Sequence, residues 1–203
     1  MIAVIDYGVG NLFSLTASLR YIGAEVCVTS RAEDLAAADQ IVLPGVGAFA
    51  DAKKKLEDTG LVDTILAQAR GGKPMLGICL GMQLLFDVSY EYGEHEGLGL
   101  IPGEVASIRE DLHEDLKVPH IGWNSLRIKD DPLFRYIHEG DYVYYVHSYY
   151  ARNCEASTIA VSSYDIPITG AVHRGSVYGT QFHPEKSGET GLRILQAFKE
   201  MKG

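Results

Sequence analysis

Short apolar runs alternate with stretches of helical periodicity along the first half of the sequence. Buried strands, mostly apolar and bounded by Gly, Pro or polar residues, are predicted at residues 2–6, 24–29, 40–43 and 75–78. Helices, with apolar side chains at helical spacing, are predicted at residues 11–22, 51–57, 61–70 and from residue 82 to 86. This alternation predicts a mainly parallel sheet with helices on both faces.

The second half changes to closely spaced strands. Strand-like segments separated by Gly, Asp and Pro turns are predicted at residues 142–150, 158–163, 171–173 and 177–182, and they favour an antiparallel extension of the sheet. An amphipathic helix over residues 191–202 then closes the chain. Because no repeat or linker interrupts the pattern, we predict a single three-layer α/β domain over residues 1–203.

Composition narrows the classes of function. The 203 residues are 46% hydrophobic and 22% charged, as in soluble globular proteins. A domain of this length buries roughly 70% of its unfolded surface, so it needs no disulfide or metal ion to fold. The formal net charge of −9 argues against a general nucleic-acid-binding surface, which needs a basic field facing the phosphates.

The cysteines and the N-terminus indicate a cytoplasmic protein. Cys27, Cys79 and Cys154 are odd in number and far apart, so they do not suggest a disulfide framework, and free thiols persist in a reducing compartment. The N-terminal segment reaches Asp6 without a basic region, unlike a signal peptide. The longest apolar stretch, residues 41–50, is broken by proline and glycine and is shorter than the ~20 residues that span a bilayer.

The segment around Cys79 has the pattern of a nucleophile elbow. A predicted strand leads into a predicted helix at Cys79, with Gly77 and Gly81 on either side, where a sharp turn leaves no room for side chains. The turn would present the sulfur to the first N–H groups of the helix, whose partial positive charge favours the thiolate. Most free cysteines are inert packing, and we accept that interpretation for Cys27. For Cys79 the paired glycines favour a nucleophile.

A base for this nucleophile is predicted near the end of the chain. His183 and Glu185 lie two positions apart at a strand end and would project to the same side, while Pro184 holds His183 extended. The carboxylate would orient the imidazole, which would exchange a proton with the sulfur. The alternative is a solvent-exposed turn. His147, flanked by strand aromatics, is a second candidate base, but it has no acid two positions on.

A glycine-containing turn follows the strand at residues 40–43. Attack on an amide carbonyl generates an oxyanion, and each preorganised N–H donor to it is worth about 3 kcal/mol. The predicted donors are the backbone N–H groups of Val46 or Gly47 and of Leu80, the residue after the nucleophile. By itself the segment is also compatible with a plain turn.

No cofactor or metal ion is predicted. Residues 6–11 contain two glycines after a strand, but Phe13 stands where a dinucleotide fingerprint needs its third glycine, and no acid ends the second strand. The sequence has no Walker motif and no His/Cys cluster at metal-ligand spacing.

Together these motifs resemble the class I glutamine amidotransferases, which use a Cys-His-Glu triad. The family signatures are GICLGMQ at residues 77–83 and FHPE at residues 182–185. Within the family, further segments are similar to the glutaminase subunits of the imidazole glycerol phosphate synthases of histidine biosynthesis: DYGVGN at 6–11, PGVG at 44–47, PHIGWN at 119–124, VHSY at 146–149 and HPEKS at 183–187. The resemblance covers nearly the whole chain.

The resemblance implies roles for individual residues. Cys79 would be the nucleophile, His183 the acid and base, and Glu185 its orienter. The α-amino and α-carboxylate groups of the substrate glutamine would be held by Gln83, Glu91, the backbone near Gly47, and His147, Ser148 and Tyr149. The alternatives are an exposed helix face for Gln83 and a solvent-exposed loop acid for Glu91.

The resemblance also implies a partner, a (β/α)8-barrel cyclase that consumes the ammonia. The residues expected on the docking face are Asn11, Trp123, Tyr144 and Lys186, with Trp123 as an ordinary core residue as the alternative. No nucleic acid or membrane is expected to bind. Three other functions stay open: a glutaminase that serves a different ammonia-dependent synthase, an inactive docking subunit, against which the complete triad argues, and a cysteine peptidase or esterase.

Overall fold

The strands direct alternate side chains into two hydrophobic cores. In the computed structural model, which describes residues 1–203, β1 (Ile2–Ile5) places Val4 in one core and Ile5 in the other. Successive side chains of a strand point to opposite faces. A sheet that is apolar on both faces has to be covered on both, and this requirement explains the three-layer arrangement.

The central sheet has a parallel and an antiparallel half. Its strands follow the order β2 (Val26–Thr29), β1, β3 (Gln40–Leu43), β4 (Met75–Ile78), β14 (Val177–Thr180), β13 (Ile166–Arg174), β12 (Thr158–Tyr164) and β9 (Arg127–Ile128). From β2 to β14 neighbouring strands run parallel, and from β14 to β9 they run antiparallel. The predicted α/β fold with an antiparallel extension is therefore confirmed.

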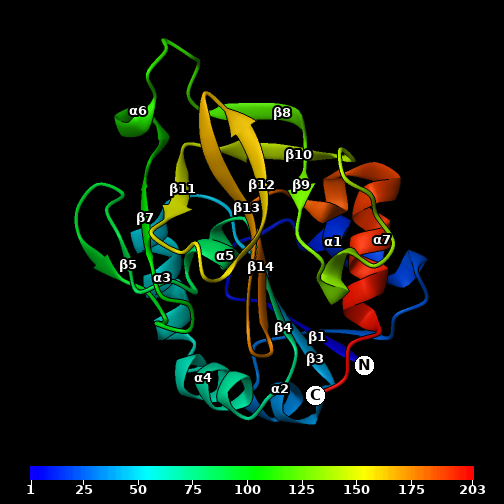
Figure 1. Ribbon diagram of the computed structural model, residues 1–203. Coiled ribbons are helices and arrows are strands. Elements are labelled where there is room, and N and C mark those ends of the chain that lie inside the picture. Colours follow the sequence, from blue (N-terminus) through cyan, green and yellow to red (C-terminus); the bar gives the residue numbers. More distant parts are fainter.

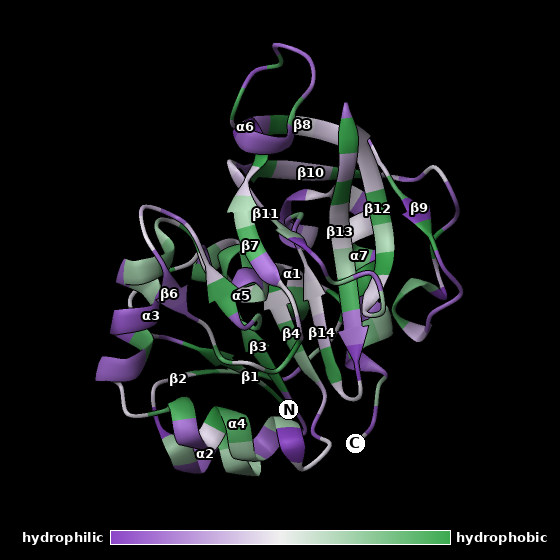
Figure 2. Ribbon diagram, turned by 60° about the vertical axis from the view of Figure 1, so that its left-hand side comes forward, coloured by the Kyte–Doolittle hydropathy of each residue, from purple (hydrophilic) through white to green (hydrophobic).

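Helices cover both faces of the sheet. Helices α1 (Leu12–Tyr21) and α7 (Gly188–Lys199) pack on one face, and α2 (Ala32–Ala37), α3 (Phe49–Asp58) and α4 (Val62–Arg70) pack on the other (Figure 1). Figure 2 shows the most hydrophobic residues in the central strands β1, β3 and β4, between these layers. None of the helices is long and apolar enough to cross a lipid bilayer.

The structure corrects the prediction for residues 142–150, which do not extend the central sheet. They form two strands, β10 (Tyr142–His147) and β11 (Tyr149–Arg152), because the chain turns at Ser148, whose carbonyl accepts a hydrogen bond from Ile108 N at 2.9 Å. Strand β10 pairs with β8 (His120–Ser125) in a separate ribbon. Strand β11 pairs with β7 (Glu104–Ser107), which continues to β5 (Val88–Ser89) and β6 (His95–Glu96).

Other elements differ in extent from the sequence prediction. The helix expected to continue to residue 86 is the single turn α5 (Leu80–Gln83). The sequence analysis predicted neither α2 nor α6 (Ile108–Asp111), and the 3-10 turns η1 (Pro132–Phe134) and η2 (Pro184–Lys186) are also additional. Short elements carry too few apolar repeats to produce a periodic signal.

The carboxyl ends of the parallel strands lie at one edge of the sheet. Four of the predicted motifs lie at this edge. Residues 6–11 follow β1, residues 44–47 follow β3, residues 77–83 span the end of β4, and residues 182–185 follow β14. In open α/β sheets, ligands bind outside the carboxyl ends of the strands. The topology thus gathers motifs that are far apart in sequence.

The side chain of Gln40 connects strand β3 to the C-terminal segment through hydrogen bonds. Gln40 is 3% exposed, and its Nε2 lies within hydrogen-bond distance of the carbonyl oxygens of Phe198, Lys199 and Met201 at 2.8, 2.9 and 2.7 Å. We expect Gln40→Ala to lower the free energy of unfolding by about 2 kcal/mol, because carbonyls at the end of α7 lose their donor. Urea denaturation should detect this loss, whereas the control Gln68→Ala, which breaks no side-chain hydrogen bond, should leave the midpoint unchanged. Equal midpoints for Gln40→Ala and wild type would contradict the prediction.

Candidate active site

Cys79 lies at a sharp corner between β4 and α5. Its φ of 53° and ψ of −111° put a non-glycine residue in a sparsely populated region, which costs energy and is typical of functional sites. The backbone N–H of Cys79 donates to Thr180 O at 2.7 Å, so neighbouring strand β14 holds the corner in place. The residue is 7% exposed. The predicted nucleophile elbow is therefore present in backbone geometry.

The two flanking glycines are required by close backbone contacts. A Cβ at Gly81 would lie 1.9 Å from Leu43 O, and a Cβ at Gly77 would lie 2.7 Å from Gly81 O. Both distances are far below van der Waals contact with backbone atoms that cannot rotate away. The turn around the sulfur can form only where these positions lack side chains.

His183 reaches Cys79 because their strands are neighbours. Strands β4 and β14 pair in parallel with Ile78 opposite Thr180, so residues just beyond both strands meet at the same edge. His183 Nδ1 lies 2.8 Å from Glu185 Oε1, and both side chains are at most 3% exposed. The predicted pair is brought together and is not a solvent-exposed turn. The reason why the two side chains meet differs from the prediction, because Glu185 lies in the 3-10 turn η2 and not on a continuing strand.

Hydrogen bonds to strand β10 hold the loop that carries His183. His183 N donates to Tyr144 O at 2.9 Å, and Tyr144 N donates to Ser187 Oγ at 2.9 Å. Ser187 Oγ in turn donates to His183 O at 2.6 Å. The imidazole therefore sits on a backbone fixed at both ends of η2.

The electrostatics of His183 favour its imidazolium form. Burial lowers the pKa of His183, but Cys79 and Glu185 raise it more strongly, and the result is a pKa of about 9. With Nδ1–H donating to Glu185, the other nitrogen, Nε2, is buried and has no hydrogen-bond partner. Glu185 Oε2 is likewise without a partner. Nε2 is thus the ring atom available for proton transfer.

The glycine loop predicted to stabilise the oxyanion borders the same cavity. A Cβ at Gly45 would lie 2.7 Å from Gly81 N, so the loop packs directly on the start of α5. Val46 is 40% exposed, and Gly47 has a φ of +95°. Leu80 occupies the first position of α5, where backbone N–H groups have no partner within the helix.

Tyr7 is a buried residue that sequence analysis missed. Its hydroxyl donates to Pro44 O at 2.6 Å and so anchors the first carbonyl of the glycine loop. Burial, followed by the nearby Cys79 sulfur, raises the pKa of Tyr7. Its place after an apolar strand, beside the glycines of residues 8 and 10, was the available signal.

A cavity of about 360 Å³ opens over Cys79, which is within the usual range for small-molecule sites. It contains most of the predicted residues: Val46, Gly47, Cys79, Leu80, Gln83, Glu91, His147, Ser148, Tyr149, His183 and Lys186. Glu185 lies behind His183 and does not line it. Pro119 and Val146 line the cavity but were not predicted.

Gln83 is buried and does not lie on an exposed helix face. Its Nε2 donates to Tyr149 O and to Gln181 Oε1, both at 3.0 Å. Because these bonds use both amide hydrogens, Gln83 Oε1 is the atom left for a donor on a substrate. Gln181, which sequence analysis missed, places Nε2 3.7 Å from Cys79 Sγ. It lies two positions before His183, a spacing that could have indicated it.

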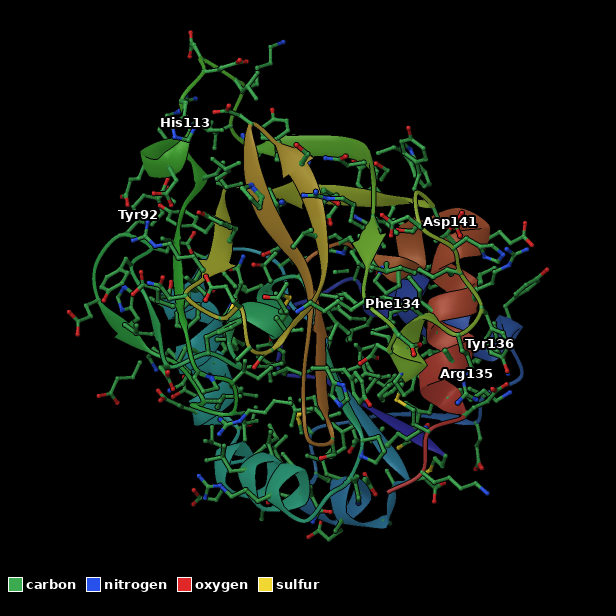
Figure 3. All side chains as sticks on the ribbon, viewed as in Figure 1. Tyr92, His113, Phe134, Arg135, Tyr136 and Asp141 are labelled. Atoms are coloured by element: carbon green, nitrogen blue, oxygen red, sulfur yellow. The ribbon has the colours of Figure 1, made fainter.

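Glu91 lies in the loop after β5, and its partly buried carboxylate contacts the first residue of α3. Its Oε2 accepts a hydrogen bond from Phe49 N at 2.6 Å, and burial raises its pKa. Its other oxygen makes no protein hydrogen bond and is available to an ammonium group. Tyr92, at the outer end of the same loop in Figure 3, is 86% exposed, and its ring meets that of Tyr149 edge-on with centroids 6.2 Å apart. Tyr92 is a further residue near the cavity that the sequence did not indicate.

His147 does not have the environment of a general base. Its Nδ1 lies 2.8 Å from Tyr149 O and its Nε2 lies 3.0 Å from His120 Nδ1, so neither nitrogen is free. Burial lowers the pKa of His147 to about 3. Of the two candidate bases, His183 is the one whose free ring nitrogen and carboxylate partner suit the role.

The four predicted docking residues differ in their exposure and surroundings. Trp123 is 55% exposed, which excludes the core alternative, and its ring meets that of Tyr144 edge-on at 6.0 Å. Lys186 is exposed and lines the cavity. Asn11 precedes α1, where its side chain accepts a hydrogen bond from Ser14 N at 3.4 Å.

The remaining cysteines and acids form no second site. Cys154 is buried and its Sγ lies 3.6 Å from Thr158 Oγ1, and burial raises its pKa. Cys27 is partly buried in β2. No group of three or more His, Cys, Asp or Glu side chains is arranged to hold a metal ion.

A cysteine on a strand-to-helix corner, with a buried histidine and glutamate, is the set of side chains that thiol-dependent acyl-transfer enzymes use. A family model for class I glutamine amidotransferases matches residues 3–201, and the chain belongs to this family. A solved structure described as a glutamine amidotransferase has a TM-score of 0.76 at 18% identity and covers 99% of this chain and 100% of its own. The PurLQS structure from Thermotoga maritima has a TM-score of 0.73 at 19% identity, with coverage of 97% and 96%.

Curated relatives match over nearly the full length. The "imidazole glycerol phosphate synthase subunit HisH" of Listeria monocytogenes is 50% identical over 202 residues, which are 99% of this chain and 96% of the relative. The protein of the same name from Caldanaerobacter subterraneus is 49% identical over 203 residues, with coverage of 99% and 98%. That of Bacillus cereus is 48% identical over 200 residues, with coverage of 98% and 94%.

The raised pKa of His183 predicts a pH dependence. Because the folded-state pKa is about 9 and the reference value is 6.5, the stability that this group contributes is complete below pH 6.5 and is lost as the pH rises through about 9. Glu185→Gln removes a charge that raises the pKa and should lower the His183 midpoint by about one pH unit or more in an NMR titration. The control Glu189→Gln, at a side chain 78% exposed, should not move it. An unchanged midpoint in Glu185→Gln would refute this assignment.

Proposed function

We propose that this protein is the glutaminase subunit of an imidazole glycerol phosphate synthase. It hydrolyses glutamine to glutamate and ammonia and supplies the ammonia to a (β/α)8-barrel cyclase, which forms imidazole glycerol phosphate and an aminoimidazole carboxamide ribotide. The observation that carries the proposal is the buried His183–Glu185 pair beside the strained Cys79 corner. The client reaction rests on curated relatives of that name, at 48–50% identity over nearly the whole chain.

The first step is attack on the side-chain amide of glutamine. The Cys79 thiolate adds to the amide carbon, and the carbonyl oxygen takes up the negative charge. Backbone N–H groups of Leu80 and of Val46 or Gly47 are the proposed donors to this oxyanion, because these residues line the cavity beside the sulfur. The first backbone N–H groups in the single turn α5 have no partner within the helix and are directed to the side of the oxyanion.

His183 then acts as the acid and afterwards as the base. An amide anion is a very poor leaving group, so the proton on Nε2 passes to nitrogen as the C–N bond breaks and ammonia departs. A thioester to Cys79 remains. Neutral His183 next accepts a proton from water, and the resulting hydroxide attacks the thioester. The C–S bond breaks, the acid leaves and loses its proton to become glutamate, and the Cys79 thiolate and the His183 imidazolium are regenerated. Glu185 keeps Nδ1 protonated throughout, as its 2.8 Å contact requires.

The cavity offers complementary groups for the α-substituents of glutamine. Oxygen atoms of Gln83 and Glu91 are free of protein partners at its wall and suit the α-ammonium group. The backbone of Ser148 and Tyr149 suits the α-carboxylate. These interactions distinguish glutamine from a peptide amide, which lacks free α-groups, and so favour a glutaminase over a peptidase.

The docking face is proposed around the cavity mouth. Free ammonia becomes protonated in bulk water and is then no nucleophile, so the product has to pass directly into the partner. Exposed Trp123 meets the partly buried Tyr144 edge-on, and an aromatic anchor is a common centre of a protein interface. Asn11 and Lys186 are the proposed polar contacts around it.

The alternative client is a different ammonia-dependent synthase. A mixture of this chain with an imidazole-forming barrel cyclase and its ribotide substrate decides between the two. Glutamine-dependent formation of imidazole glycerol phosphate supports the proposal. Hydrolysis of glutamine without product transfer would assign the chain to another client.

Cys79→Ala should separate the two half-reactions. In the complex with the cyclase, we expect glutamine-dependent synthesis to fall at least about 1,000-fold, because the nucleophile is lost. Synthesis with added ammonium salt should continue, since the cyclase site is elsewhere. The control Cys27→Ala, a cysteine in β2, should retain both activities. If Cys79→Ala loses both, the residue is structural and not the nucleophile.

Trp123→Ala should weaken the complex. We expect the Kd for the cyclase to rise at least about tenfold, as for a typical aromatic anchor. The matched control is Tyr21→Ala, which removes a more exposed aromatic side chain at the opposite end of α1 from Asn11. Calorimetric or fluorescence titration measures both. A Kd that is equal for Trp123→Ala and wild type would exclude Trp123 from the interface.

A further inference from the structure

A chain of hydrogen bonds leads from the β8–β10 ribbon to the substrate cavity. Asn124 Nδ2 lies 3.3 Å from His120 Nε2, His120 Nδ1 lies 3.0 Å from His147 Nε2, and His147 Nδ1 lies 2.8 Å from Tyr149 O. The first residue adjoins exposed Trp123, and the last lines the cavity. The mechanism described above uses neither imidazole.

The direction of every bond in this chain is determined by its two ends. Tyr149 O can only accept, so His147 carries its proton on Nδ1 and presents Nε2 as an acceptor. His120 must then donate from Nδ1 and accept at Nε2. At the other end the amide of Asn124 is oriented independently, since its Nδ2 donates to Ser163 O and its Oδ1 accepts from Ser125 N, both at 2.9 Å. Both rings therefore have the same tautomer.

The surroundings of the two rings keep them neutral. His120 is 3% exposed and His147 is 6% exposed, and burial lowers their pKa values to about 4 and about 3. His120 is stacked between the rings of Tyr145 and Tyr164, with centroids 4.8 and 4.2 Å away. The other titratable group that acts on His147 is His183, whose positive charge disfavours a second one.

The chain of hydrogen bonds converges with the catalytic site at one carbonyl. Tyr149 O accepts from His147 Nδ1 on one side and from Gln83 Nε2 on the other. Gln83 Nε2 also donates to Gln181 Oε1, and Gln181 Nε2 points to Cys79 Sγ. The orientation of this single peptide group is thus shared between the imidazoles and the residues beside the nucleophile.

We infer that His120 and His147 are positioning residues for the amino-acid part of the substrate: two neutral imidazoles, each protonated at Nδ1, hold the Ser148–Tyr149 backbone in the conformation that binds the α-groups of glutamine. The break between β10 and β11 falls at Ser148, whose carbonyl is held by Ile108 N, and Tyr149 begins β11. The imidazole-to-carbonyl bond adds a side-chain restraint at this first residue of the strand. This inference rests on the proposed glutaminase activity.

Paired substitutions test the roles of the individual nitrogens. The amide nitrogen of Asn occupies the position of histidine Nδ1, and that of Gln occupies the position of Nε2. His147→Asn can still donate to Tyr149 O, whereas His147→Gln cannot. His120→Asn can likewise still donate to His147, whereas His120→Gln cannot. Thermal melting of each variant in complex with the cyclase shows whether it is folded.

Steady-state hydrolysis of glutamine by the complex gives the first readout. We expect His147→Gln to raise KM about tenfold with kcat within about twofold of wild type, because a restraint on substrate binding is lost, and His147→Asn to stay within about threefold of the wild-type KM. The His120 pair should follow the same order with smaller changes. Equal KM values for the Asn and Gln variants, or a fall in kcat at constant KM, overturn the inference.

A readout independent of activity is the tautomer of each ring in the wild-type protein. Imidazole ¹⁵N chemical shifts, assigned with the His120 and His147 variants, should show Nδ1–H neutral rings at neutral pH. An Nε2–H ring or an imidazolium at either position overturns the inference. A wild-type complex that fails to hydrolyse glutamine overturns the proposed function instead, and the two failures are therefore distinguishable.

Discussion

The site depends on one constraint, the parallel pairing of β4 with β14. This pairing places the end of β4, which precedes Cys79, beside the end of β14, which precedes His183. The hydrogen bond from Cys79 N to Thr180 O continues the pairing as far as Cys79. The unfavourable backbone conformation at Cys79 persists because its N–H bonds to β14 and its carbonyl accepts from Gln83 N in α5. Without this register the predicted nucleophile Cys79 and the predicted base His183, from distant parts of the chain, would not line the same cavity.

Burial and charge act together around this pairing. An isolated buried imidazole loses its charge, yet His183 keeps a pKa of about 9 because Cys79 and Glu185 outweigh its burial. The pKa of His147, which is also buried but has no carboxylate partner, is lowered to about 3 by burial, with a smaller contribution from the neighbouring His120 and His183. Two histidines on one cavity wall thus have opposite protonation states, one suited to proton transfer and the other to fixed hydrogen bonding.

The residues that sequence analysis identified are those whose role is encoded by near neighbours. The glycines two positions before and after Cys79 mark the corner by their spacing, although the atom that excludes a side chain at Gly81 is the distant Leu43 O. Pro184, between His183 and Glu185, lies in a short turn. Gln181 and Tyr7 were missed because each acts on an atom far away in sequence, Cys79 Sγ and Pro44 O respectively. The division of residues 142–150 into two strands was missed because both halves are rich in β-forming residues, and the break is imposed by tertiary hydrogen bonds at Ser148 and Tyr149.

By itself the sequence determined the parallel half of the sheet, the nucleophile elbow and the pairing of His183 with Glu185, because hydrophobic periodicity and glycine spacing are local properties of the chain. Only the tertiary structure decided which strand lies beside which, and therefore which carbonyl, amide or imidazole meets each functional side chain. Those contacts join residues that are far apart in sequence, such as Gln83 and Gln181 or His120 and His147, and no local pattern indicates that they meet. Strand order is a global outcome of covering two apolar faces at once, and so it cannot be read from any single segment.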